Sequence, residues 1–285
     1  MAEEDPSETP EGPRSLQSPG VHSKVYVPII MHIFRDKFDE DCEFIDFTLD
    51  DVRKTADLLG IKARNAADVI YRMRSRTILP PEITDKGFFV LKAIGRGRYR
   101  LEKAPSTILD IPVGAILDAL DITPLPVRRL LPAELAKIDE QGLLTIVNYC
   151  NILAHFTGLR IYRLRSHFRR SVIVIGQVEL DALDVGVALS DDETPILFPV
   201  EAKALHEPIN RVQIAGLVQF CEQYYPKYSI RPLIVKVDHN SLVHLLEFNA
   251  TPNPGDLTIV KAATYRIRLS DSQKKYIAES EAYVL

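Results

Sequence analysis

Two pairs of charged residues are the part of this sequence best suited to chemistry. Glu179 and Asp181 are separated by one residue, and so are Glu201 and Lys203. Because side chains i and i+2 of a β-strand point to the same face, each pair presents both charges on one side of a strand. An almost wholly apolar run, residues 196–200, leads into the second pair. If the two strands are neighbours in one sheet, the four side chains converge on one patch.

Carboxylates and a lysine held by a rigid sheet suit phosphodiester hydrolysis. Oxygen ligands from Glu179, Asp181 and Glu201 favour Mg²⁺, which keeps several waters and can also contact a phosphate oxygen. Lys203 can orient or help to deprotonate the attacking water, and it can stabilise the charge that grows on the phosphorane. The alternative is that these are solvated residues at strand ends. Two such pairs about 20 residues apart, with an apolar run before the second pair and a helix after it, favour the catalytic interpretation.

Hydrophobic periodicity predicts the elements that position these residues. The second half of the chain is expected to contain a helix over about 135–156, strands near 160–165, 171–188 and 195–203, a helix near 209–224 and a strand near 231–237. Gln213 falls on the second of these helices, about ten residues after Lys203. It either faces the charged patch or is an exposed polar residue.

The first half of the chain predicts three helices and a hairpin, the pattern of a winged helix. Helices are expected over 25–38, from Thr48 to Gly60, and from Asn65 to Arg76, with Thr48 and Asn65 as N-caps. Hairpin strands are expected over 88–92 and 98–101, joined by a turn with two glycines.

Cations are concentrated in this half. Residues 62–100 contain ten lysines and arginines against three acids, a local balance of +7 in a chain whose net charge is −4. A charge run is often a solvated face, but beside a hairpin it favours contact with double-stranded DNA. His167 lies in a basic stretch before the charged pairs and either faces phosphate or has a structural role. The candidate DNA-binding residues are Arg64, Asn65, Arg72, Arg76, Lys92, Arg96, Arg98 and His167.

The order of Asp181 and then Glu201-Ala202-Lys203 resembles the PD-(D/E)XK nuclease superfamily, and a wider set of residues resembles a bacterial family of restriction-endonuclease-like proteins within it. The similar stretches span about residues 45–240. They are Asn65–Tyr71, Gly95–Tyr99, Asn151 with Leu153, Ser166-His167, Gly176–Asp181, Val200–Lys203 and Val212–Ile214.

The resemblance implies a Mg²⁺-dependent DNA endonuclease with a winged-helix amino-terminal half. Its catalytic core would be Asp181, Glu201 and Lys203, with Glu179 as a helper and Gln213 facing the site. Members of the family often carry an acid on the helix before the core. Glu140 and Gln141 stand near that position, and the pattern does not decide between them.

The fold class expected is therefore α/β (α+β), a winged helix followed by a restriction-endonuclease-like mixed-sheet core. The expected divisions are a disordered tail at 1–22, a winged-helix domain at 23–103, a linker at 104–132 and a nuclease domain at 133–285. The tail is rich in Glu, Pro, Ser and Gly, and 104–132 contains several prolines without a clear period.

Composition excludes several other classes of protein. There is no apolar run near the length that spans a bilayer, and the acidic, proline-rich start does not resemble a signal peptide, so we expect a cytoplasmic protein without a membrane partner. The sequence contains no Gly-rich phosphate loop, so no nucleotide cofactor is expected.

Two functional hypotheses follow. The first is a sequence-specific DNA endonuclease of the type II restriction kind, acting as a homodimer so that each strand of a duplex meets one active site. The second is a catalytically inactive winged-helix regulator or sensor of modified DNA. The intact Asp181, Glu201 and Lys203 favour the first.

Overall fold

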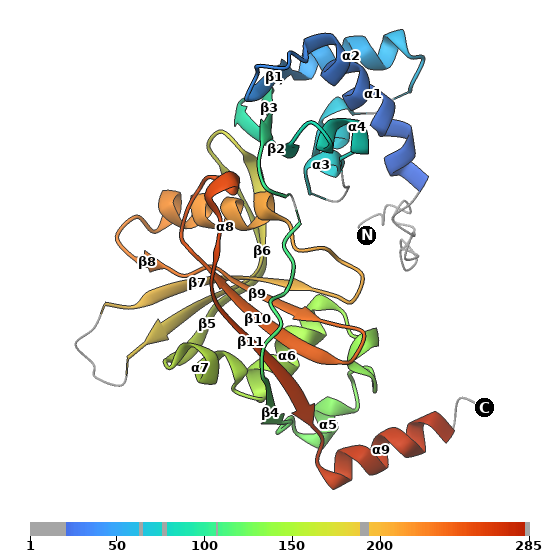
Figure 1. The fold of residues 1–285 in the computed structure, drawn as a ribbon. Coiled ribbons are helices and arrows are strands. Elements are labelled where there is room, and N and C mark those ends of the chain that lie inside the picture. The colour runs from blue at the N-terminus through green and yellow to red at the C-terminus, as the bar shows by residue number, and fades with distance from the viewer. Residues whose placement is uncertain (1–20, 63–64, 76–78, 107, 189–193, 283–285) are drawn as a thin grey trace, which may run out of the picture.

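The protein has a mixed α+β fold with one small and one large sheet (Figure 1). The computed structural model describes residues 21–62, 65–75, 79–106, 108–188 and 194–282. Of the tail expected at 1–22, residues 1–20 lie outside these ranges, as do Arg64 and Arg76, whereas residues 21 and 22 are the first two of a helix. The mixed α+β class predicted from periodicity is confirmed.

The amino-terminal unit (residues 21–103) consists of helices packed on a three-stranded antiparallel sheet of order β1-β3-β2. Thr48 starts the second helix with a full capping box, in which Thr48 and Asp51 each accept a hydrogen bond from the other's backbone N–H. One apolar cluster, drawn from residues 26–101, forms its core. The elements are α1 (Val21–Lys37), β1 (Phe44–Thr48), α2 (Leu49–Leu58), α3 (Ala66–Ser75), α4 (Pro81–Thr84), β2 (Phe88–Gly95) and β3 (Arg98–Lys103).

The core unit (residues 108–282) is built on an eight-stranded mixed sheet of order β4-β11-β10-β9-β7-β6-β5, with β8 paired to β7. Its strands are β4 (Ile116–Leu120), β5 (Arg160–Val172), β6 (Gly176–Val187), β7 (Ile196–Lys203), β8 (Ser229–Ile230), β9 (Leu233–Val237), β10 (Leu242–Phe248) and β11 (Ile259–Arg268). Its helices are α5 (Leu125–Arg128), α6 (Glu140–Tyr149), α7 (Ile152–Thr157), α8 (Arg211–Tyr224) and α9 (Asp271–Ala282), with 3₁₀ turns at Leu135–Lys137 and Pro254–Asp256.

Helices cover both faces of the large sheet. Apolar residues of α6 and α7 pack with one set of strand residues, including Val235 and Val237. The apolar residues of α8 pack with the alternate set, including Ile234 and Leu183. Because successive strand residues point to opposite faces, this alternation explains why β7 and β9 are nearly continuous apolar runs.

The helix expected over 135–156 is two helices instead of one. α6 ends at Tyr149, and Asn151 adopts a left-handed conformation (φ 52°) before α7 begins. Asn is among the few residues that adopt this conformation at low cost, so the break lies at a residue suited to it.

The stretch 104–132, interpreted from its prolines as a linker, is largely part of the core unit. Residues 116–120 form β4, which pairs in parallel with β11 and makes one edge of the sheet. Four of the five β4 side chains are exposed, so the strand lacks the buried alternation by which strands are recognised in sequence.

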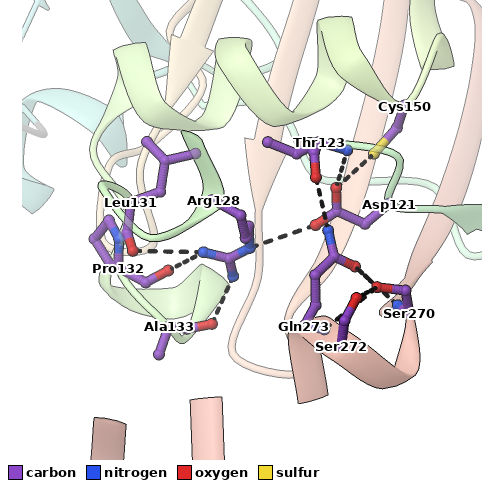
Figure 2. Close-up of polar contacts among 10 residues, drawn as sticks. All are labelled: Asp121, Thr123, Arg128, Leu131, Pro132, Ala133, Cys150, Ser270, Ser272 and Gln273. Atoms are coloured by element: carbon purple, nitrogen blue, oxygen red, sulfur yellow. Dashed lines mark hydrogen bonds and ion pairs between the residues drawn. The ribbon is translucent and has the colours of Figure 1, made fainter. Parts of the chain in front are cut away.

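A buried ion pair, Asp121 with Arg128, fixes the segment after β4 (Figure 2). The Arg128 guanidinium also donates to the backbone carbonyls of Pro132 (2.7 Å) and Ala133 (2.8 Å). Gln273 of α9 donates to the Thr123 carbonyl at 3.1 Å, which ties the carboxy-terminal helix to the same segment.

The two units are in contact through α3 and α8. Asn210, the N-cap of α8, donates to the Arg74 carbonyl at 3.1 Å, and Arg74 donates to the Ile175 carbonyl at 3.3 Å. Within the described part of the chain, no helix combines the length and apolar character needed to cross a membrane.

Candidate active site on β6 and β7

The predicted charged patch lies where β6 and β7 separate. The backbone pairing of the two strands runs from Gly186 with Ile196 to Ala182 with Val200. One residue beyond it, Oδ2 of Asp181 accepts a hydrogen bond from the Ala202 N–H at 2.8 Å. The carboxylate thus takes the place of a backbone acceptor at the point where the ladder ends.

The rigid partner on the other side of β7 is β9. This parallel pairing continues to Lys203, opposite Lys236. The last residues of β7 are therefore paired with β9 on one side. On the other side they are no longer paired with β6, and Asp181 lies there.

Glu201 and Lys203 form a buried ion pair on β7. Their residues are 8% and 6% exposed, and Nζ of Lys203 lies 2.7 Å from Oε1 of Glu201. Gln213 of α8 donates to the same oxygen from Nε2 at 3.2 Å. The structure therefore brings together four of the residues singled out in the sequence: Asp181, Glu201, Lys203 and Gln213.

Burial shifts the pKa values of Glu201, Asp181 and Lys203. It raises the pKa of Glu201 to about 7, against the opposing effect of the Lys203 ammonium, while repulsion from Asp181 adds to the rise. The pKa of Asp181 is also raised by burial, although its hydrogen bond from Ala202 and the charge of Lys203 act the other way. Burial alone would lower the pKa of Lys203, but the attraction of Glu201, Glu207 and Asp181 raises it above its ordinary value.

Two further acids complete the cluster. Glu207, in the loop between β7 and α8, accepts a hydrogen bond from the Ala204 N–H at 3.0 Å and interacts electrostatically with Asp181, Glu201 and Lys203. Glu140, the first residue of α6, has its pKa raised to about 7 by burial, by a hydrogen bond with Glu207 and by the nearby Asp181. Of the two candidates for an acid on the preceding helix, Glu140 is therefore the residue that reaches the site.

Lys236 holds the loop that carries Glu207. From β9, its ammonium donates to the backbone carbonyls of Ala204 (3.0 Å), Leu205 (3.1 Å) and Glu207 (2.7 Å). Sequence reasoning did not identify Glu207, because it follows the strand in a loop where periodicity carries no information. The sequence indicates a site role for Glu207 only through its position four residues after Lys203.

Glu179 lies beside this cluster but has other partners. Its Oε2 accepts a hydrogen bond from Arg169 at 2.5 Å, and its Oε1 lies 3.6 Å from Nε2 of His167. Its negative charge still raises the pKa of Asp181. His167, placed by the sequence in a basic stretch, is two-thirds exposed on β5, the edge strand next to β6.

The candidate DNA-binding residues of the amino-terminal unit differ in their surroundings. Arg96 and Arg98 are exposed in the β2–β3 hairpin, and Asn65 is exposed at the start of α3, where its Oδ1 accepts from the Ala67 N–H at 3.0 Å. Arg72 forms an ion pair with Asp68 at 3.0 Å. Lys92 is partly buried: it forms an ion pair with Glu102 of the same unit at 2.5 Å and donates to Asn253 of the core unit at 3.1 Å.

The acid cluster is suited to a divalent cation in charge and in donor type. Glu140, Asp181, Glu201 and Glu207 supply hard oxygen atoms beside the ammonium of Lys203. Burial is the largest cause of the raised pKa values of Glu140, Asp181 and Glu201, and repulsion between neighbouring acids adds to it. Within the described ranges, however, no three Asp, Glu, His or Cys side chains are already arranged around one ion position.

A search for related proteins found no family model, no curated protein and no solved structure that matches this chain.

Proposed function

We propose that the chain is a Mg²⁺-dependent DNA endonuclease that hydrolyses phosphodiester bonds in a specific sequence context, as a type II restriction enzyme does. The observation that carries the proposal is the buried Glu201–Lys203 pair, held by Gln213 and facing Asp181 at the separating ends of β6 and β7. A buried lysine and glutamate with three partly buried acids around them are costly to fold, which supports a chemical role over a structural one.

Each residue of the cluster has a distinct role in this proposal. Asp181 and Glu201 would hold the metal, with Glu140 and Glu207 as further acids and Glu179 as a helper released from Arg169. Mg²⁺, when bound, supplies Lewis-acid polarisation of the phosphate and a more acidic water. Lys203 stays protonated and directs its positive charge at the scissile phosphate, while Gln213 fixes the orientation of the Glu201 carboxylate.

The distribution of cations supports DNA as the substrate. β5 lies at the edge of the large sheet beside the catalytic strands, and Arg160, Arg165 and Arg170 on it are exposed without a recorded carboxylate partner among the described residues. Exposed arginines can contact phosphates without regard to sequence. They would guide the backbone of the nucleic acid toward Asp181 and Lys203.

For the amino-terminal unit we propose the role of a winged helix. Its order of elements, with β1 pairing β3 and a β2–β3 hairpin after α3, fits a recognition helix followed by a wing. In this arrangement α3 would enter the major groove, and Arg96 and Arg98 would contact the flanking backbone. A homodimer would supply the second active site needed to cut both strands of a duplex.

One experiment tests the cutting activity. The purified chain is incubated with unmethylated genomic DNA and Mg²⁺, and the ends produced are sequenced. We expect defined ends from the wild type and none from Lys203→Ala or Asp181→Ala, with DNA affinity in both variants within about tenfold, ~1.4 kcal/mol, of the wild type.

The outcomes separate the two hypotheses. Lys203→Ala protein that cuts at the wild-type rate would remove the lysine from the mechanism and overturn the proposal. Wild-type protein that binds DNA tightly and cuts neither unmethylated nor methylated DNA would identify a DNA-binding regulator or sensor.

A further inference from the structure

A cavity of about 390 Å³ lies between the two units, away from the acid cluster. Its walls come from α3, the β2–β3 hairpin and the turn that joins β5 to β6. From α3 it receives Ala67, Tyr71 and Arg74, which share one helix face by their spacing of four and three residues. From the hairpin it receives Arg96 and Tyr99.

The lining combines aromatic rings with positive charge. Two phenol rings and two guanidinium groups line the cavity, and no carboxylate side chain is among its lining residues. Arg74 lies close enough to both Tyr71 and Tyr99 to interact with their phenol groups electrostatically, and burial lowers its pKa. The Arg74 guanidinium donates a hydrogen bond to the Ile175 carbonyl. Among the described residues, it donates none to a carboxylate. In the part of the chain that the structure describes, Arg74 is thus a partly buried cation with no carboxylate bonded to it.

These properties fit one kind of ligand. Cavities of roughly 300–1,000 Å³ bind small molecules, and planar bases stack on aromatic side chains while guanidinium groups bind phosphate oxygens. We propose that this cavity binds a single nucleotide unit turned out of the DNA, with its base against Tyr71 and Tyr99 and its phosphate at Arg74 and Arg96. The inference rests on the proposed function in taking the nucleotide from DNA.

The cavity is connected to the acid cluster along one strand. Gly176, in the cavity wall, is the first residue of β6, the strand that carries Asp181. With a rise of about 3.3 Å per residue, five residues along the strand place Asp181 roughly 17 Å away. Arg169, the partner of Glu179, also interacts electrostatically with Tyr71. A nucleotide bound here would therefore lie within a few nucleotides of the bond to be cut, where its base or a modification on it can govern cutting.

The test is calorimetric titration of the full chain with each of the common 2′-deoxynucleoside 5′-monophosphates and with 2-deoxyribose 5-phosphate. We expect at least one nucleotide to bind about tenfold or more tightly than the sugar phosphate, because the base adds stacking to the phosphate contact. Tyr71→Ala and Arg74→Gln should each weaken nucleotide binding by about tenfold or more, whereas Tyr71→Phe, which keeps the ring, should retain it.

Tyr228→Ala is the matched control, because Tyr228 is 43% exposed and Tyr71 is 40% exposed. Its nucleotide affinity should equal that of the wild type. Since Tyr71 is partly exposed, Tyr71→Ala gives a readout even if Arg74→Gln fails to fold. The inference is overturned if the sugar phosphate binds as tightly as every nucleotide, if no nucleotide binds, or if Tyr71→Ala binds as the wild type does.

The same titration separates this inference from the nuclease proposal. Lys203→Ala should bind the nucleotide as the wild type does, because Lys203 is not in the cavity wall. A wild-type chain that binds the nucleotide but cuts no DNA would support the cavity site and overturn the nuclease. A chain that cuts DNA but binds no nucleotide would overturn the cavity site alone.

Discussion

Lys203 and Gln213 donate hydrogen bonds to the same oxygen, Oε1 of Glu201, from a strand and from a helix. The distances are 2.7 Å and 3.2 Å. Within the described residues, Oε2 of Glu201 has no recorded hydrogen bond. One oxygen of the carboxylate is thereby fixed from two elements of the fold.

Gln213→Leu should reduce cleavage while leaving DNA binding unchanged. The variant removes one hydrogen bond to a charged group, worth about 1.5–3 kcal/mol, so kcat should fall roughly tenfold to a hundredfold. KM should change little, because Gln213 contacts Glu201 and not the amino-terminal unit, to which we assign DNA binding. Steady-state cleavage assays measure both quantities. Gln219→Leu, on the same helix but bonded to the Pro252 carbonyl, is the control and should cut normally. Equal rates for the two variants would argue against a positioning role for Gln213.

Without a divalent cation, the protein should lose stability as the pH rises from about 5 to 8. The pKa of Glu201 is raised in the folded state from its ordinary value of 4.5 to about 7. The stabilisation from its neutral form is therefore complete below the unfolded-state pKa and is lost as the pH passes through the folded-state value. The loss is roughly 3 kcal/mol at most.

Denaturant unfolding at several pH values in the presence of a chelator measures this loss. Glu201→Gln should make the dependence shallower without removing it, because the pKa of Glu140 is also raised to about 7 and this carboxyl titrates in the same range. Mg²⁺ should restore stability to the wild type at high pH. A Glu201→Gln protein with the wild-type pH profile would show that this carboxyl does not titrate in the window.

Replacing Arg72 and Arg76 together by alanine should weaken DNA binding and reduce its salt dependence. Each lost phosphate contact lowers the slope of log K against log salt by about 0.9. Binding is titrated at several salt concentrations in Ca²⁺, so that cutting is suppressed. Lys274→Ala with Lys275→Ala removes the same charge from α9, at the far end of the molecule (Figure 1), and should leave the slope unchanged. An unaltered slope in the arginine variant would exclude α3 from the DNA contact.

Arg128→Met should destabilise the core unit by about 3–5 kcal/mol, because it leaves the buried carboxylate of Asp121 without its cation (Figure 2). Arg268→Ala breaks an ion pair with Asp118 in which both side chains are more than half exposed, and its unfolding temperature should stay close to that of the wild type. Calorimetric unfolding compares the two. The interpretation fails if Arg128→Met unfolds at the same temperature as Arg268→Ala.

The catalytic candidates were predictable from sequence because strand geometry fixes which residues share a face. The alternation in β6 and β7 was sufficient to group Asp181, Glu201 and Lys203, and helix α8 brought in Gln213. The role of Glu179 as a helper stays a prediction, because its carboxylate contacts Arg169 and His167. Sharing a side of the strand with Asp181 does not determine its partner, and Arg169 on the neighbouring strand competes for it.

Other features depended on contacts between distant segments. Glu140 reaches Asp181 only because α6 packs on the sheet with its first residue at this end, which no local pattern reports. β4 was missed because an exposed edge strand lacks alternation, and β10 and β11 were not predicted at all. In the first half, α2 and the hairpin were predictable because the Thr48 cap and the glycines of the β2–β3 turn act locally, whereas β1 and α4 were not predicted.

The parallel pairing of β4 with β11 means that the core unit cannot complete its sheet early in synthesis. Residue 116 pairs with residue 264, so this edge of the sheet cannot close until most of the chain has left the ribosome. The amino-terminal unit, by contrast, makes its apolar cluster from residues 26–101 and can fold as soon as they emerge. The amino-terminal unit would then fold before the core unit, and the acid cluster would form only late in synthesis.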